Sequence, residues 1–222
     1  MPSPFDQSSY QVRFDWGIDG LHRLAPADLV IVVDVLRFSS TLPDALAAGQ
    51  QVALADAMRW STNGAPLVHA AARADATAEV LVGGIRNAAA VARAVMSVQE
   101  RRAARTSVSV IAAGELTAAG ELRFAVEDQL GAGAVIAALS DLGIDHSSPE
   151  AAAAAESFRA LRRGLRHMLI GSGSGRELVD GVASTARMAA AGIRAATTAE
   201  AAELDAVDAV PVLREGGFAL FG

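Results

Sequence analysis

The apolar positions of this chain follow two spacings, which predict strands and helices in turn. The clearest stretch is a continuous run of five apolar residues, Leu29 to Val33, four of them β-branched. Such a run is typical of a strand buried on both faces, as in a parallel sheet. The strands predicted from apolar or alternating stretches are residues 11–16 at an edge, 27–33, 51–55, 79–82 and 107–112.

Apolar residues at helical spacing separate these strands. Ser148 is placed to cap an alanine-rich helical region that extends to Ile170, and Pro149 suits its first position. The other predicted helices are residues 41–48 with Gly49 as a stop, 87–102, 126–139 and a helix from Arg176.

The end of the chain, residues 207–213 and 217–220, predicts a closing hairpin around Arg214-Glu215-Gly216. Strands that alternate with helices indicate an α/β fold. We therefore expect three α/β/α layers around a largely parallel or mixed sheet, in a single domain over residues 1–222.

Composition narrows the class of protein. The net charge of −6 argues against nucleic acid as a partner, because such binding rests on a surplus of cations. The absence of cysteine excludes disulfides, thiolate catalysis and Cys-ligated zinc. There is no lysine, so any cationic phosphate contact must come from arginine. With no apolar stretch long enough for a membrane span and no signal-peptide pattern in residues 1–16, we expect a cytoplasmic protein, and a homodimer is a reasonable guess.

Chemistry concentrates where the buried strand ends. Asp34 follows Val33 directly, and Arg37, Ser39 and Ser40 come within the next six positions. Ligands of open α/β sheets bind at the carboxyl ends of the strands. Because a carboxylate can hold Mg²⁺ and a guanidinium can fork onto phosphate, this segment predicts a phosphoryl site. Asp34 could alternatively do no more than cap the next helix.

Further polar segments are expected near strand ends. Thr62-Asn63-Gly64 follows Trp60, Arg86-Asn87 follows the strand 79–82, and Gly114-Glu115 follows the strand 107–112. Each has a plainer explanation, since Asn-Gly is most often a turn and Asn87 could be an N-cap. Glu127 and Asp128 could only complement a helix dipole. Together, however, Asp34, Glu127 and Asp128 could supply the carboxylate oxygens that a hard cation prefers.

The glycine-serine run over residues 171–175 suggests a phosphate cradle at a helix start. It matches neither a P-loop nor a dinucleotide fingerprint, which must follow a strand. We therefore interpret it as a hinge between two helices, from which Arg176 could still reach a site.

Five segments, in order and in rough spacing, carry a family resemblance over most of the chain. They are Asp34-Val35-Leu36-Arg37-Phe38-Ser39-Ser40-Thr41; Thr62-Asn63-Gly64; Gly83-Gly84-Ile85-Arg86-Asn87-Ala88; Ala113-Gly114 with Phe124-Ala125-Val126-Glu127-Asp128 and Ala132-Gly133-Ala134; and Ala202-Glu203-Leu204-Asp205 through Val210-Pro211-Val212-Leu213. Together these segments resemble the 2-phosphosulpholactate phosphatase family.

The resemblance implies an α/β, Mg²⁺-dependent phosphatase that hydrolyses a small-molecule phosphate ester in coenzyme M synthesis. By the same resemblance, the Mg²⁺ ligands are Asp34, Glu127 and Asp128, and these three residues with Arg37 are the catalytic set. The residues implied to bind the anionic substrate are Ser39, Ser40, Asn63, Gly64, Asn87 and Gly114, together with Arg37.

The chain also departs from the family. The family has a loop and a strand before Thr-Asn-Gly, whereas here residues 57–60 continue directly into Ser61. Either part of the site is lost, or the sequence omits a stretch between Trp60 and Ser61. We expect omission, because losing a central strand would leave unpaired backbone groups inside the sheet. Ala125 also stands where the family has serine.

These departures leave a second function open. A catalytically silent relative would bind a small anion or a protein partner without turnover. A haloacid-dehalogenase-type phosphatase is disfavoured, because that family needs a second aspartate two residues after the first and Leu36 occupies that position.

Overall fold

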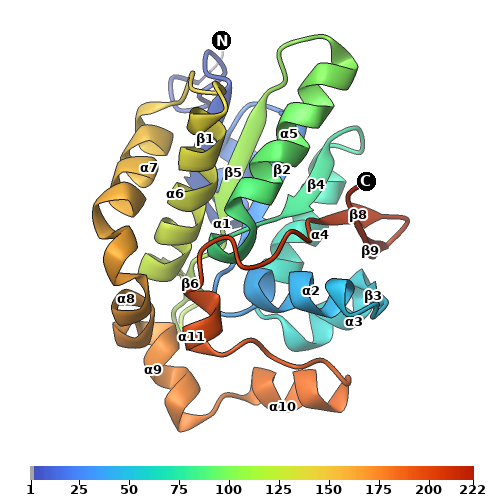
Figure 1. The fold of residues 1–222 in the computed structure, drawn as a ribbon, viewed down its shortest axis with the longest axis vertical. Coiled ribbons are helices and arrows are strands. Elements are labelled where there is room, and N and C mark those ends of the chain that lie inside the picture. The colour runs from blue at the N-terminus through green and yellow to red at the C-terminus, as the bar shows by residue number, and fades with distance from the viewer. Residues whose placement is uncertain (1–2) are drawn as a thin grey trace.

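A mixed seven-stranded sheet forms the centre of the protein in the computed structural model, which describes residues 3–222 (Figure 1). The first two residues of the segment expected to lack a signal peptide lie outside the described part. The strand order is β1-β5-β2-β4-β8-β9-β3, and a separate two-stranded ribbon pairs β6 with β7. The strands are β1 (Val12–Trp16), β2 (Leu29–Val33), β3 (Val52–Ala53), β4 (Glu79–Val82), β5 (Val108–Ala112), β6 (Glu115–Leu116), β7 (Leu122–Arg123), β8 (Pro211–Arg214) and β9 (Gly217–Leu220).

Helices cover both faces of this sheet, and the helices of residues 173–180 and 183–190 lie below it at the lower end of Figure 1. The helices are α1 (Gly17–Arg23), α2 (Phe38–Ala47), α3 (Leu54–Trp60), α4 (Gly64–Ala74), α5 (Ala88–Arg102), α6 (Val126–Asp141), α7 (Pro149–Leu161), α8 (Leu165–Gly171), α9 (Gly173–Asp180), α10 (Ala183–Ala190) and α11 (Thr198–Ala201). Short 3-10 turns span Ile85–Asn87 and Arg162–Gly164. No helix of the described residues is both long and apolar enough to cross a bilayer.

Alternation along β2 explains why the sheet is buried on both sides. Ile31 and Val33 pack into one core with α5 and α6, whereas Val30 and Val32 pack into a second core with α2 and α4. All five residues of β2 are buried, and the strand pairs in parallel with β4 and β5. The two cores, one on each face, give the three-layer α/β/α arrangement, and the fold class predicted from the sequence is confirmed.

Most elements lie where the sequence predicts them. The parallel strands β1, β5, β2 and β4 occupy one side of the sheet, and the closing hairpin β8-β9 continues it in antiparallel fashion. The alanine-rich region divides into α7 and α8, because the turn at Arg162–Gly164 interrupts it. The next helix, α9, begins at Gly173 and not at Arg176, since Ser172 caps it by accepting a hydrogen bond from the N–H of Gly175.

One expectation about the region near Trp60 is wrong. Thr62-Asn63-Gly64 does not follow a strand, because residues 54–60 form helix α3 and Asn63 precedes α4. The omission expected between Trp60 and Ser61 stays a prediction. Along the given sequence Ser61 directly follows α3, and its N–H donates to the carbonyl of Ala57 at 2.8 Å.

The physical reason for expecting an omission was the unpaired backbone of a lost central strand. The fold avoids this problem because β4 pairs with β2 on one side and with β8 on the other. The antiparallel hairpin β8-β9 and the short strand β3 then complete the sheet.

Candidate active site

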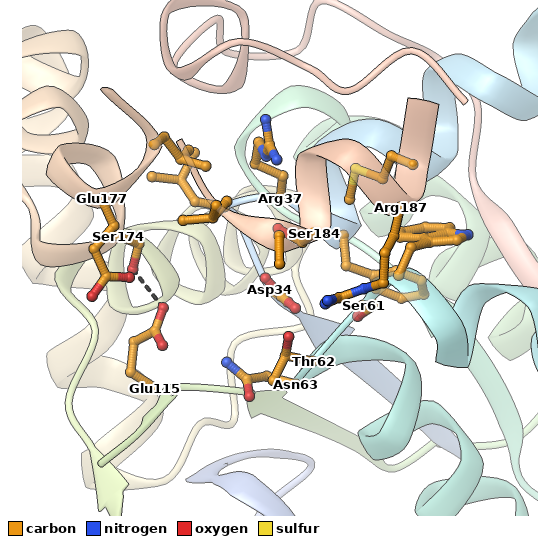
Figure 2. Close-up of a pocket in the computed structure, with 17 residues that line it drawn as sticks. Asp34, Arg37, Ser61, Thr62, Asn63, Glu115, Ser174, Glu177, Ser184 and Arg187 are labelled. Atoms are coloured by element: carbon orange, nitrogen blue, oxygen red, sulfur yellow. Dashed lines mark hydrogen bonds between the residues drawn. The ribbon is translucent and has the colours of Figure 1, made fainter. Parts of the chain in front are cut away.

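A cavity of about 280 Å³ opens beside the carboxyl end of β2 (Figure 2). Its floor comes from the loop after β2 and from the α3–α4 junction, and its outer wall comes from α9 and α10. The lining residues are Asp34, Leu36, Arg37, Phe38, Trp60, Ser61, Thr62, Asn63, Glu115, Ser174, Glu177, Leu178, Val182, Ala183, Ser184, Arg187 and Met188.

Asp34 is held in place from two sides. Its Oδ2 atom accepts a hydrogen bond from the N–H of Gly64 at 2.7 Å, and its own N–H donates to the hydroxyl of Ser39. Burial, reinforced by the negative charges of Glu115 and Glu127, raises the pKa of Asp34 to about 7, although the amides of Gly64 and Phe38 act in the opposite direction. A carboxyl group with this pKa can gain or lose a proton near neutral pH.

Gly64 is required by this close approach. A Cβ atom at position 64 would lie 2.5 Å from Cδ1 of Phe38 and 2.7 Å from Oδ2 of Asp34. Both distances are far below van der Waals contact, so only glycine lets the start of α4 reach the carboxylate.

Asp128 and Glu127, in the first turn of α6, lie next to Asp34 but bond differently. Asp128 accepts hydrogen bonds from the N–H of Val35 at 2.7 Å and from the N–H of Gly114 at 2.9 Å, one on each carboxylate oxygen. It therefore ties the loop after β2 to the loop after β5. Burial, with the charges of Asp34 and Glu127 nearby, raises the pKa of Asp128.

Ser174 bridges two carboxyl groups. Its hydroxyl contacts Oε1 of Glu115 at 2.6 Å, the bond dashed in Figure 2, and also contacts Oε1 of Glu127. A serine hydroxyl has one hydrogen, so it can donate to only one of them.

The other predicted residues divide into those on the cavity wall and those behind it. Asn63 lines the cavity, and its buried Oδ1 accepts no hydrogen bond from the described residues. Arg37 lines it too, but Nη2 donates to the hydroxyl of Thr185 on α10 at 2.5 Å, and Figure 2 shows its guanidinium pointing away from Asp34.

Ser39, Ser40, Asn87 and Gly114 lie behind the wall. The hydroxyl of Ser40 donates to the carbonyl of Val35 at 2.7 Å, within the loop after β2. The amide of Asn87 accepts from the N–H of Gly84 and donates to the carbonyl of Ala209. These side chains therefore shape the loops around the cavity, whereas Gly114 contributes its N–H to Asp128.

Several polar residues of the cavity were not predicted as site residues, among them Glu115, Ser174 and Arg187. Glu115 had a signal, because Gly114-Glu115 follows a strand. Ser174 lies in the glycine-serine run that was interpreted as a hinge, and it reaches the site while the neighbouring Arg176 is exposed and outside the cavity lining. Arg187 had no local signal.

The predicted metal ligands do not form a ready-made site. Within residues 3–222, no three Asp, Glu or His side chains are grouped so that they could hold one metal ion. Both oxygens of Asp128 accept backbone hydrogen bonds, and Glu127 is bonded to Ser174. The residues in this arrangement do not fit a three-carboxylate magnesium site.

Comparison with known protein families shows to which family the chain is related. The sequence model of the 2-phosphosulpholactate phosphatase family matches residues 50–216. The chain belongs to this family. The matched part contains Asn63, Glu115, Glu127, Asp128, Ser174 and Arg187, whereas Asp34, Arg37, Ser39 and Ser40 precede it. A search of curated proteins gave no significant match.

Membership of the 2-phosphosulpholactate phosphatase family implies phosphoric monoester hydrolysis, and thus a phosphate ester as substrate. The family match alone says nothing of Asp34, because that residue lies before the matched part. The cavity connects Asp34 with the matched part of the chain, because Asn63, Glu115 and Ser174 of that part line the same cavity as Asp34.

Proposed function

We propose that this protein hydrolyses a small anionic phosphate ester, 2-phosphosulpholactate or a related 2-phospho acid. The observation that supports this most strongly is that Asp34, a buried carboxyl group of pKa about 7, lines the same cavity as the hydroxyl of Ser174 and the carboxyl group of Glu115. Hydrolysis needs groups that take up and give protons, since a proton must leave the attacking water and another must reach the departing alcohol oxygen.

In this mechanism Asp34 takes the proton from the attacking water. The bond between phosphorus and the ester oxygen breaks, and the Glu115–Ser174–Glu127 group delivers a proton to the departing oxygen. The pKa of Asp34 suits this role, because a general base works best with a pKa near the working pH. Arginine side chains of the cavity stabilise the charge on the phosphoryl oxygens.

Magnesium dependence is a separate proposal that rests on the family resemblance. The three carboxylates predicted to bind Mg²⁺ do not converge, so no step of this mechanism is assigned to a metal. Activity measured with and without EDTA tests the requirement directly.

The test is phosphate release from a panel of 2-phospho acids that includes 2-phosphosulpholactate. We compare the wild type, Asp34→Asn and Asp180→Asn, whose exposed carboxylate at the end of α9 is absent from the cavity lining. The proposal expects release by the wild type and by Asp180→Asn, and a loss of about 10²-fold or more in Asp34→Asn. No release by folded wild-type protein under any metal condition would contradict it.

A catalytically silent, anion-binding relative is the second candidate. Ala125, where the family has serine, and the direct α3–α4 junction favour it, because both reduce the polar groups available to the site. Tight binding of a 2-phospho acid without turnover would support this candidate, and measurable turnover would exclude it.

A further inference from the structure

Arg187 is the cation of the cavity that faces the proposed base. It extends from the last turn of α10, and Figure 2 shows its guanidinium pointing toward the side of the cavity where Asp34 and Ser61 lie. Arg37, the other arginine on the wall, points the opposite way and is bonded to Thr185. The two arginines therefore differ in what they can offer to a ligand.

The guanidinium of Arg187 has no partner of its own. Among residues 3–222 it takes part in no ion pair, and no hydrogen bond joins it to another side chain or to the backbone. A guanidinium carries five N–H donors in a planar fork that matches two oxygens of a phosphoryl group. The donors of Arg187 are thus available on the cavity side.

The helix that carries Arg187 is anchored close to it. Met188, the next residue, is buried in the same core as Phe38 and Trp60. Just beyond α10, the carbonyl of Gly192 accepts a hydrogen bond from Nε2 of Gln50 at 3.0 Å. A cation on a fixed element loses less conformational freedom when it binds a ligand.

The negative charge of the cavity also favours a cation at the position of Arg187. The carboxylates of Asp34, Glu115 and Glu177 line the cavity, so an anionic ester that enters it meets negative charge. If Asp34 activates the attacking water, the phosphoryl group must lie beside Asp34, on the side toward which Arg187 points.

We infer that Arg187 binds the phosphoryl group of the ligand. This inference rests on the proposed function for the identity of the ligand, but binding of inorganic phosphate tests it without turnover. The alternative is a structural role, in which the positive charge in the last turn only complements the dipole of α10. That role would affect thermal stability and leave the affinity for phosphate unchanged.

The experiment uses inorganic phosphate as the probe and the full chain as wild type, Arg187→Gln, Arg187→Lys and Arg176→Gln. Arg176 is an exposed arginine of α9 outside the cavity lining, so its variant changes net charge equally. Calorimetric titration measures the affinity, and thermal unfolding checks that each variant is folded. We expect phosphate to bind roughly 10–100-fold more weakly to Arg187→Gln, the range that corresponds to losing a charged hydrogen-bonded contact. Arg187→Lys should fall between, and Arg176→Gln should match the wild type.

The outcomes separate this inference from the proposed function. If esters are hydrolysed but Arg187→Gln keeps the phosphate affinity and KM of the wild type, the inference fails and the phosphatase proposal stands. If phosphate binding depends on Arg187 but no ester is hydrolysed, the inference stands and the phosphatase proposal fails. A folded wild type that does not bind phosphate, or equal weakening in Arg176→Gln, would also overturn the inference.

Discussion

The N–H of Gly64 donates to Oδ2 of Asp34 at 2.7 Å, which joins the start of α4 to the end of β2. This bond connects two of the segments that carry the family resemblance, although helix α2, strand β3 and helix α3 lie between Asp34 and Gly64 in the chain. It also fixes the orientation of the buried carboxylate on the cavity floor. The site therefore depends on a backbone contact as much as on side chains.

Gly64→Ala should damage both stability and activity. The new methyl group would meet Phe38 and Asp34 at distances of 2.5 and 2.7 Å, so α4 must move and the bond to Asp34 must lengthen. We expect the free energy of unfolding to fall by about 1–3 kcal/mol, as for other overpacked sites, and kcat to fall with it. Urea unfolding and steady-state kinetics measure the two effects.

Gly171→Ala is the matched control. Nothing lies within 4 Å of a Cβ atom at position 171, which is the last residue of α8. This variant should keep wild-type activity and stability, and equal behaviour of the two variants would contradict the steric explanation.

The raised pKa of Asp34 predicts that stability decreases as the pH rises through the acidic range. Below pH 3.8 the carboxyl group is protonated in both states. Between 3.8 and about 7 the unfolded chain loses this proton while the folded protein keeps it, so the folded state binds more protons and the free energy of unfolding falls with pH. The raised pKa of Asp128 acts in the same direction.

Asp34→Asn should flatten this dependence and stabilise the protein above pH 7 by roughly 1–3 kcal/mol, because an uncharged amide avoids the desolvation that burial imposes on a carboxylate. Urea titrations at several pH values give the slope. Asp180→Asn should retain the wild-type slope, and an unchanged slope in Asp34→Asn would show that another group carries the dependence.

The sequence predicts the cavity floor around Asp34 much better than the outer wall that α9 and α10 form. Asp34 was found because a continuous apolar run ends at it, and a buried strand in an α/β sheet presents such a residue to the ligand crevice. The partner of its carboxylate, Gly64, was found through a motif whose predicted location after a strand was wrong, because residues 54–60 are helical.

The outer wall of the cavity had no sequence signal as strong as the apolar run before Asp34. Ser174 and Arg187 belong to short helices that cover the cavity by long-range packing, and helical periodicity does not say which cavity a helix will cover. Asn87 shows the opposite problem. Its position after a strand suggested ligand binding, yet its side chain is bonded to Gly84 and Ala209. Local patterns identify polar residues near a site, but only tertiary contacts show which of them face it.

Arg86, beside Asn87, should prove to be structural. Its buried guanidinium bonds to both carboxylate oxygens of Asp44, at 3.0 and 3.2 Å, and to the carbonyl of Glu200. Removing one member of a buried ion pair leaves the other without its partner. We expect Arg86→Gln to lower the free energy of unfolding by about 2–4 kcal/mol and to leave KM unchanged where the variant is folded.

Arg93→Gln provides the comparison, since Arg93 forms an exposed ion pair with Asp208. Exposed pairs contribute little, so this variant should remain within about 0.5 kcal/mol of the wild type. If both variants lost similar stability, burial would not be the cause.

Ser174→Ala should separate catalysis from stability. The change removes the hydroxyl that joins Glu115 to Glu127 and with it the proposed route for the proton to the departing oxygen. General acid catalysis typically contributes 10²–10⁴-fold, so we expect kcat to fall by about 10²-fold or more with little change in KM. Ser172→Ala, two residues earlier, removes the cap of α9 instead and should cost about 1 kcal/mol of stability while kcat is retained below the unfolding range. If Ser174→Ala kept the kcat of the wild type, the proton would have to come from another group, and Glu177, on the same helix and on the wall of the same cavity, would be the next residue to change.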